Sequence, residues 1–254
     1  PELRGSIPGS GQLAMELSAA GQAGAAAAAA QRTQDGSGRT YRDTTYITFG
    51  AAGLAGVWAE SNTREALFDA MRRKETFATS GPRIRVRFFG GAAFALSDFD
   101  DPGFLARAYA EGVPMGGDLY GTADGRPPRF AVWAVRDPLE APLQRLQVIK
   151  GWTADGTSHE AIYDVACSDG LAVDPATHRC PDNGARVDVS TCSISGDVGA
   201  DELRAVWTDP DFQADQLAFY YVRVLQNPTC RWSTWDAIRS GVEPRRDMPV
   251  TIQE

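Results

Sequence analysis

A switch in periodicity near residue 80 constrains the fold of this chain most strongly. From residue 62 to residue 74 the apolar side chains recur at helical spacing, and they are Leu67, Phe68 and Met71. After Gly81 and Pro82 they recur at every second residue, and they are Ile84, Val86 and Phe88. The sequence therefore predicts a helix with its apolar stripe on the core side, then a polar turn, then a strand.

The ends of this helix carry capping signals. Asn62 is expected to be the N-cap, with Glu65 three residues later reaching back to the open amide of the cap. The cationic run from Arg72 to Lys74 suits the negative end of the helix dipole. The preceding stretch from Gly50 to Gly56 is predicted to be a flexible loop.

Composition excludes several classes of protein. The chain has 254 residues, 43% of them hydrophobic, and a formal net charge of -8, so it can bury a core of its own. A surplus of negative charge disfavours a nucleic-acid partner, because neutralising phosphates requires Lys and Arg. No apolar run approaches the roughly twenty residues that span a bilayer, so no transmembrane segment is expected.

All four cysteines fall in the last third of the chain, in segments rich in Asp, Gly, Pro and Ser. No pair has the Cys-x-x-Cys spacing of a zinc knuckle, and the clustering favours disulfides. Three pairings are open. We favour Cys167 with Cys180 and Cys192 with Cys230, because the first closes a short loop and the second ties a late segment to an earlier one. Disulfides indicate a periplasmic or extracellular protein, and the alternative is four unpaired thiols in a cytosolic protein.

Residues 1–52 form a separate, low-complexity region of Gly, Ala, Ser and Gln. The alanines favour a helix from Leu13 to Gln31, but Gly21 and Gly24 interrupt it, so an exposed arm or insertion is expected instead. A short strand is predicted at Thr44 to Phe49.

The rest of the chain is mostly β, after one or two short helices between Phe94 and Gly112. The acidic run from Ser97 to Pro102 is predicted to be a helix entry, because it lacks the ligand spacing of a calcium loop. Four strands and one short helix follow. The strands are Arg129 to Arg136, which is apolar on both faces, Leu146 to Trp152, Glu160 to Val165 and Ala218 to Leu225, and the helix is Asp201 to Trp207. Asp155 and Gly156 predict a hairpin, and the whole predicts a β-sandwich-like domain.

Several motifs carry a resemblance to a known family. They are Gly53–Glu60, the helix and turn Asn62–Arg83, Gly112–Leu119, Phe219–Leu225, Arg231–Ala237 and Thr251–Glu254. Together they resemble the C-terminal portion of a bacterial family of unknown function related to the PHP (polymerase and histidinol phosphatase) metallohydrolases, a group that includes carbamate ester hydrolases.

The resemblance implies a fold, a reaction and a cofactor. It implies an α+β chain, in which residues 53–83 are the last helix of a PHP-like α/β barrel and its junction, and residues 84–254 are a mostly antiparallel β-sandwich-like domain. Such hydrolases bind divalent zinc, manganese or iron through residues that precede this helix. His159 and His178 are the two histidines of this chain, and neither matches those ligands. By this resemblance the chain is a C-terminal fragment with no metal ligand of its own, and its partner is the missing N-terminal catalytic portion.

The candidate catalytic residues flank the helix. Thr79, Ser80 and Arg83 lie in the turn that would approach a neighbouring loop or the domain interface, and Glu60 is a candidate for a carboxylate behind the metal ligands. The alternative is that the turn is a linker whose hydroxyls bind local backbone groups.

Two hypotheses for function follow. The first is a secreted metal-dependent hydrolase acting on a small ester-type or phosphoester substrate, of which this chain is the C-terminal part. The second is a non-catalytic β module that binds a glycan or protein partner through Arg231, Trp232 and Trp235, since aromatic faces stack on sugars and guanidinium binds anions. Packing between domains is the alternative role for these tryptophans. The first hypothesis predicts an exposed apolar face, and the second predicts a closed, monomeric fold.

Overall fold

The computed structural model describes residues 32–34, 40–42, 53–120, 125–245 and 247–253. The chain divides into two units, Pro1–Gly50 and Ala51–Glu254. In the first unit, β1 (Arg32–Gln34) and β2 (Thr40–Arg42) pair as antiparallel strands. The strand predicted at Thr44 to Phe49 and the alanine-rich segment from Leu13 to Gln31 lie outside the described residues.

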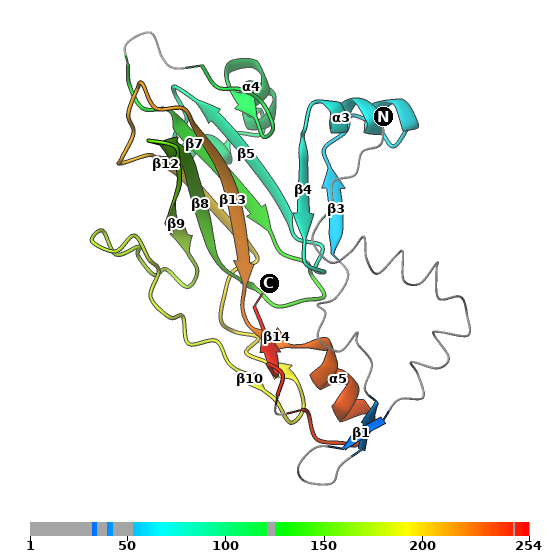
Figure 1. Cartoon of the computed structure of the whole chain (residues 1–254). Coiled ribbons are helices and arrows are strands. Elements are labelled where there is room, and N and C mark those ends of the chain that lie inside the picture. The colour runs from blue at the N-terminus through cyan, green and yellow to red at the C-terminus, as the bar shows by residue number, and fades with distance from the viewer. Residues whose placement is uncertain (1–31, 35–39, 43–52, 121–124, 246, 254) are drawn as a thin grey trace. The chain divides into compact units, whose positions relative to one another are not determined.

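Two antiparallel sheets form the centre of the second unit (Figure 1). The first has the order β12-β7-β5-β6, with β5 (Arg85–Gly91), β6 (Val113–Pro114), β7 (Arg129–Val135) and β12 (Glu202–Thr208). The second has the order β13-β8-β9, with β8 (Leu143–Ala154), β9 (Thr157–Cys167) and β13 (Ala218–Gln226). The chain is therefore an α+β protein of mostly antiparallel sheet, as predicted, and its described residues form no barrel.

The two sheets share one hydrophobic core, as in a β-sandwich. The four-stranded sheet contributes buried side chains from β5, β7 and β12, and the three-stranded sheet contributes Leu143, Leu146 and Val148. On β7, Val132 and Ala134 face this core, while Ala131 and Trp133 face the opposite side. The prediction of a central strand covered on both faces is confirmed.

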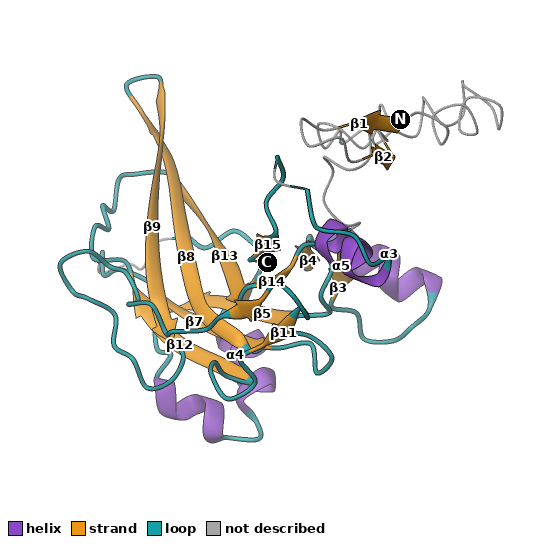
Figure 2. Cartoon of the chain, turned by 90° about the horizontal axis from the view of Figure 1, so that it is seen from below, coloured by secondary structure: helices purple, strands orange, loops and turns teal. Residues whose placement is uncertain are grey.

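A helical layer covers the other face of the four-stranded sheet (Figure 2). It consists of the 3₁₀ helix η2 (Leu96–Asp100) and α4 (Phe104–Glu111), which pack through Phe99 and Phe104. The acidic run supplies helix-entry contacts, as predicted. The Asp98 carboxylate accepts the Ala95 amide at 2.8 Å, and the Asp101 carboxylate accepts the Gly103 amide at 2.8 Å.

The hairpin between β8 and β9 is confirmed and is longer than predicted. Its turn places Asp155 and Gly156 at positive φ, 51° and 72°, which is the conformation that an Asp-Gly pair favours in a two-residue hairpin loop. The helix predicted at Asp201 to Trp207 is wrong, because this segment is strand β12. Leu203 and Ala205 are buried at alternate positions and pair with β7, so the period is two rather than 3.6.

The helix predicted between residues 62 and 74 is α3 (Arg64–Arg72), and three expectations about it and its neighbours are wrong. The N-cap is Thr63 rather than Asn62, since the Thr63 hydroxyl accepts the Ala66 amide at 3.3 Å. Phe68 and Met71 do not face a core: they are 56% and 54% exposed. The expected loop before the helix and the expected polar turn after it contain β3 (Leu54–Val57) and β4 (Thr76–Thr79), which pair with each other.

The last part of the second unit is fastened by disulfides. It contains β10 (Val187–Asp188), β11 (Ser193–Ile194), β14 (Thr229–Cys230), α5 (Trp232–Arg239) and β15 (Thr251–Ile252). Cys167 bonds to Cys180 and Cys192 bonds to Cys230, so the favoured pairing is confirmed. The second disulfide ties the end of the β10-β11 loop to β14.

Candidate functional site

A groove of about 490 Å³ lies between β4 and the sandwich. Its floor is formed by Ile84, just before β5, and by Val86 and Phe88 of β5, which alternate toward the core. One wall is β4 with the turn that follows it, and the other wall is β13. Met115 and Gln253 complete the lining. The volume is within the range of small-molecule and peptide sites.

Four of the six motifs that carry the family resemblance contribute residues to this groove. They contribute Thr76–Ser80 with Pro82, then Met115, then Tyr221–Leu225, and finally Gln253. Gln253 is held in place because its side-chain nitrogen donates to Gln144 Oε1 at 2.7 Å and to the Gln226 carbonyl at 3.0 Å. Four segments that are far apart in the sequence therefore meet at one place.

The predicted catalytic residues divide between the groove and the surface. Thr79 and Ser80 line the groove, and the Thr79 hydroxyl accepts the Gly81 amide at 3.3 Å, as expected for a local backbone contact. Arg83 is exposed in the turn before β5, and its backbone amide donates to Asp137 Oδ2 at 2.8 Å. Glu60 is exposed in the loop before α3. Of these four residues, Thr79 and Ser80 line the groove, whereas Glu60 and Arg83 do not.

A cluster around Glu75 was not found from the sequence. Tyr109 donates its hydroxyl to the buried Glu75 carboxylate, and Arg87 donates to the Tyr109 oxygen at 2.6 Å. Burial, followed by the hydrogen bond to Glu75, raises the pKa of Tyr109. The Arg87 guanidinium also lies 3.6 Å from the centre of the Trp58 ring, and the Trp58 indole donates to the Val86 carbonyl. These contacts fix the β3-α3-β4 segment, and with it one wall of the groove, to β5 and α4.

A second missed cluster lies inside the sandwich and is centred on Lys150. Its Nζ lies 2.6 Å from Asp209 Oδ2 and donates to the Asp211 carbonyl at 2.8 Å. Tyr220 donates to Asp209 at 2.7 Å, and Tyr163 donates to Asp211 at 2.6 Å. Burial and these carboxylates raise the pKa of both tyrosines. Because the charged groups have partners, the cluster holds the sheets together rather than presenting a reactive group.

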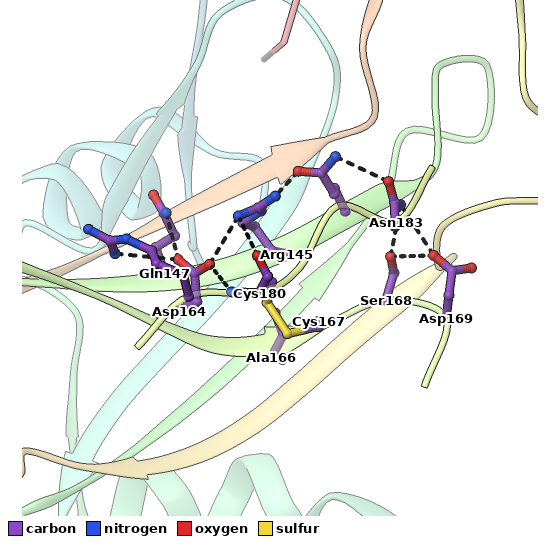
Figure 3. The surroundings of a disulfide bond; sticks show 11 residues. Arg145, Gln147, Asp164, Ala166, Cys167, Ser168, Asp169, Cys180 and Asn183 are labelled. Atoms are coloured by element: carbon purple, nitrogen blue, oxygen red, sulfur yellow. Dashed lines mark hydrogen bonds and ion pairs between the residues drawn. A yellow bond between two sulfur atoms is a disulfide. The ribbon is translucent and has the colours of Figure 1, made fainter. Parts of the chain in front are cut away.

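The Cys167–Cys180 loop is anchored by a buried carboxylate (Figure 3). Asp164 accepts hydrogen bonds from the Gln147 side chain and the Cys180 amide, both at 2.7 Å, and from Arg145 at 3.1 Å. Further along the loop, Asn183 donates to Ser168, Asp169 and Asn227. Although burial opposes it, hydrogen bonding from Ser168, Gly199 and Asn183 lowers the pKa of Asp169. The loop is thus fastened by both a covalent bond and a polar network.

The candidate binding residues Trp232 and Trp235 lie at the start of α5. Trp232 and Trp235 are 36% and 38% exposed and stand three residues apart, on neighbouring positions of the helix surface. The Arg231 guanidinium lies 5.3 Å from the Trp232 ring, and that of Arg239 lies 5.2 Å from the Trp235 ring. Both indoles are partly exposed, whereas the predicted binding residue Arg231 is buried, 6% exposed, and donates to the Ser233 hydroxyl at 2.6 Å.

The described residues do not fit a metal site. Within the ranges that the structure covers, no group of three or more His, Cys, Asp or Glu side chains is arranged to hold a metal ion. His159 stacks on Trp152, with ring centres 5.3 Å apart, and His178 lies against the edge of Tyr163. None of the described helices is both long and apolar enough to cross a membrane.

Fold and groove define an α+β protein built on an antiparallel β-sandwich. The chain belongs to the family described as "Protein of unknown function (DUF3604)", which it matches over residues 12–254. Comparison with curated proteins and with solved structures found no match.

Proposed function

We propose that this chain is the C-terminal portion of a periplasmic or extracellular, metal-dependent hydrolase of the PHP-like class. The observation that carries the proposal is the convergence of four motifs of the resemblance on one groove, with Thr79 and Ser80 in its wall. In that class, bound zinc, manganese or iron activates the water that attacks an ester-type bond. The described residues hold no group of three or more side chains arranged for a metal, so under this proposal the preceding barrel would supply the ligands.

Two further observations support the proposal. Leu54, Phe68 and Met71 of the β3-α3-β4 segment are exposed apolar side chains, and a neighbouring barrel would cover them. The two disulfides favour a compartment outside the cytosol. Under this proposal α3 belongs to the last part of the barrel, and the β-sandwich is an appended domain.

The full-length protein tests the proposal. We expect it to hydrolyse 4-nitrophenyl acetate or bis(4-nitrophenyl) phosphate, to lose this activity on chelation, and to regain it on addition of Zn²⁺, Mn²⁺ or Fe²⁺. A full-length protein that is metal-free and inert toward both substrates would contradict the proposal.

Ser80 allows a test of the groove in the same reaction. Ser80→Ala removes an exposed hydroxyl from the groove wall and is expected to lower kcat/KM about tenfold, as for one lost transition-state hydrogen bond. Ser190→Ala, in the exposed β10-β11 loop, is the matched control and should leave kcat/KM unchanged. Equal kcat/KM values for the two variants would show that Ser80 does not contribute to the reaction.

The exposed indoles of α5 favour a second candidate function, a module that binds a glycan or a protein. In this case Trp232→Ala and Trp235→Ala should abolish retention on a glycan array or on a partner surface. Tyr120→Ala, which removes another exposed ring, should not change it. Unchanged binding in both tryptophan variants would exclude α5 as the contact.

A further inference from the structure

The two walls of the groove are strand edges rather than strand faces. A strand that presents a face to a cavity lines it with every second residue, as Val86 and Phe88 of β5 do, together with Ile84 just before it. In contrast, β4 and β13 line the groove with consecutive residues, Thr76–Thr79 and Tyr221–Leu225. Their backbones therefore border the groove directly.

Both edges lack a neighbouring strand in the part of the chain that the structure describes. β13 pairs with β8 on one side and is the outer strand of the β13-β8-β9 sheet. β4 pairs only with β3. A long outer strand with exposed apolar side chains, here Phe219 and Tyr221, is a template for pairing with another chain unless it is covered.

Arg223, at the centre of the β13 edge, indicates which side chain a strand paired with β13 would carry. Within the described ranges, the Arg223 guanidinium makes one hydrogen bond, 3.5 Å long, to the neutral Gln147 Oε1, and no ion pair with a carboxylate. Residues opposite each other on paired strands point to the same face, so the residue opposite Arg223 would meet this cation. An acidic side chain suits that position.

The floor of the groove indicates which side chains the added strand would carry on either side of the acidic residue. Val222 and Val224 face the core together with Ile84 and Val86. Residues opposite these two valines would point onto the same apolar floor, so apolar β-branched side chains suit them.

We propose that the groove binds one extended peptide segment of a partner protein, which adds to β13 as a fourth strand of the β13-β8-β9 sheet. The segment carries apolar residues opposite Val222 and Val224 and an acidic residue opposite Arg223. Backbone hydrogen bonds give the affinity, and these three side chains give the register.

A designed peptide tests the proposal on the chain itself. The probe is acetyl-Thr-Thr-Val-Glu-Val-Thr-Thr-amide, titrated by calorimetry, with hydrogen exchange of the complex measured by mass spectrometry. Saturable binding that protects the amides of residues 218–226, and leaves the opposite outer strand β9 unchanged, is expected. A peptide of the same sequence with alternate backbone nitrogens methylated should not bind.

A charge exchange tests the register. Arg223→Glu should weaken binding of the probe at least about tenfold, as for one charge-assisted contact, and should favour a probe with Lys in place of Glu. Arg186→Glu, at an exposed arginine before β10, is the control and should change neither affinity.

Three outcomes would overturn the proposal. They are no saturable binding of the probe, equal binding of the methylated peptide, and dimerisation of the chain through β13 that the probe does not displace. The first would leave the groove without a peptide, the second would show docking through side chains alone, and the third would make a second copy the occupant.

Discussion

Lys150 Nζ lies 2.6 Å from Asp209 Oδ2 inside the sandwich, and the two side chains are 2% and 0% exposed. The pair joins β8 to the residue that follows β12, so it links the two sheets. Lys150→Met leaves the Asp209 carboxylate buried without its cation, and we expect a loss of about 3–5 kcal/mol in the free energy of unfolding, measured with urea at neutral pH. The double variant Lys150→Met/Asp209→Leu should recover part of this loss. A loss below about 1 kcal/mol in the single variant would show that the pair is no stronger than a surface one.

Tyr220 makes the stability sensitive to alkaline pH. Its pKa is raised in the folded state by burial and by the hydrogen bond to Asp209, so the stability it contributes is complete below the ordinary tyrosine pKa of 10.0 and is lost as the pH rises above it. Tyr220→Phe should therefore flatten the fall in stability above pH 10, while costing about 1 kcal/mol at pH 7 for the lost hydrogen bond. Thermal unfolding across this pH range gives both values. Tyr221→Phe, at the exposed neighbouring ring, is the control, and an unchanged slope in Tyr220→Phe would contradict the assignment.

Gly116 is required by its backbone conformation and by its surroundings. Its φ is +84°, and an added Cβ would overlap the backbone oxygen of Lys74, which follows the C-cap of α3. Gly116→Ala should cost about 2–4 kcal/mol, because strain and overlap add. Gly170 also has a positive φ, +67°, but no atom lies within 4 Å of an added Cβ. Gly170→Ala should therefore lower the free energy of unfolding by only about 1 kcal/mol. Chemical denaturation of both variants separates the two effects, and equal losses would mean that the contact with Lys74 is unimportant.

The two disulfides should differ in their contribution to stability. Cys192 and Cys230 are 38 residues apart and Cys167 and Cys180 are 13 apart, so loop-closure entropy predicts about 4 and about 3 kcal/mol. Paired serine variants, compared by urea denaturation, measure each contribution. Loss of the Cys192–Cys230 pair should also release β14 from the β10-β11 loop, which limited proteolysis can detect. Equal stability of either variant and the unmodified protein would contradict the prediction.

The sequence predicted the elements whose signals are local. The Asp155-Gly156 turn and the two-faced strand β7 each carry their own pattern, and both are confirmed. The segment from Asp201 to Trp207, by contrast, is predicted to be a helix but forms strand β12, in which Leu203 and Ala205 are buried at alternate positions. Pairing with β7, a contact from distant sequence, determines its conformation.

The groove and the two charged clusters depend on such distant contacts. Thr79 and Ser80 were singled out by their position after α3, but β13 and Gln253 reach the same groove from more than 140 residues away along the chain. Glu75 and Lys150 read as single charged residues in the sequence. Their partners, Tyr109 and Asp209, are specified by the packing of separate elements.

The central claim, that this chain is part of a larger metal-dependent hydrolase, is tested most directly by one sample. Protein purified from its natural source without reducing agent should be analysed by intact mass spectrometry and for metal content. We predict a mass well above the 27.3 kDa of this chain, with at least one divalent zinc, manganese or iron ion per molecule. A mass of 27.3 kDa, or a larger protein that holds no metal, would contradict it.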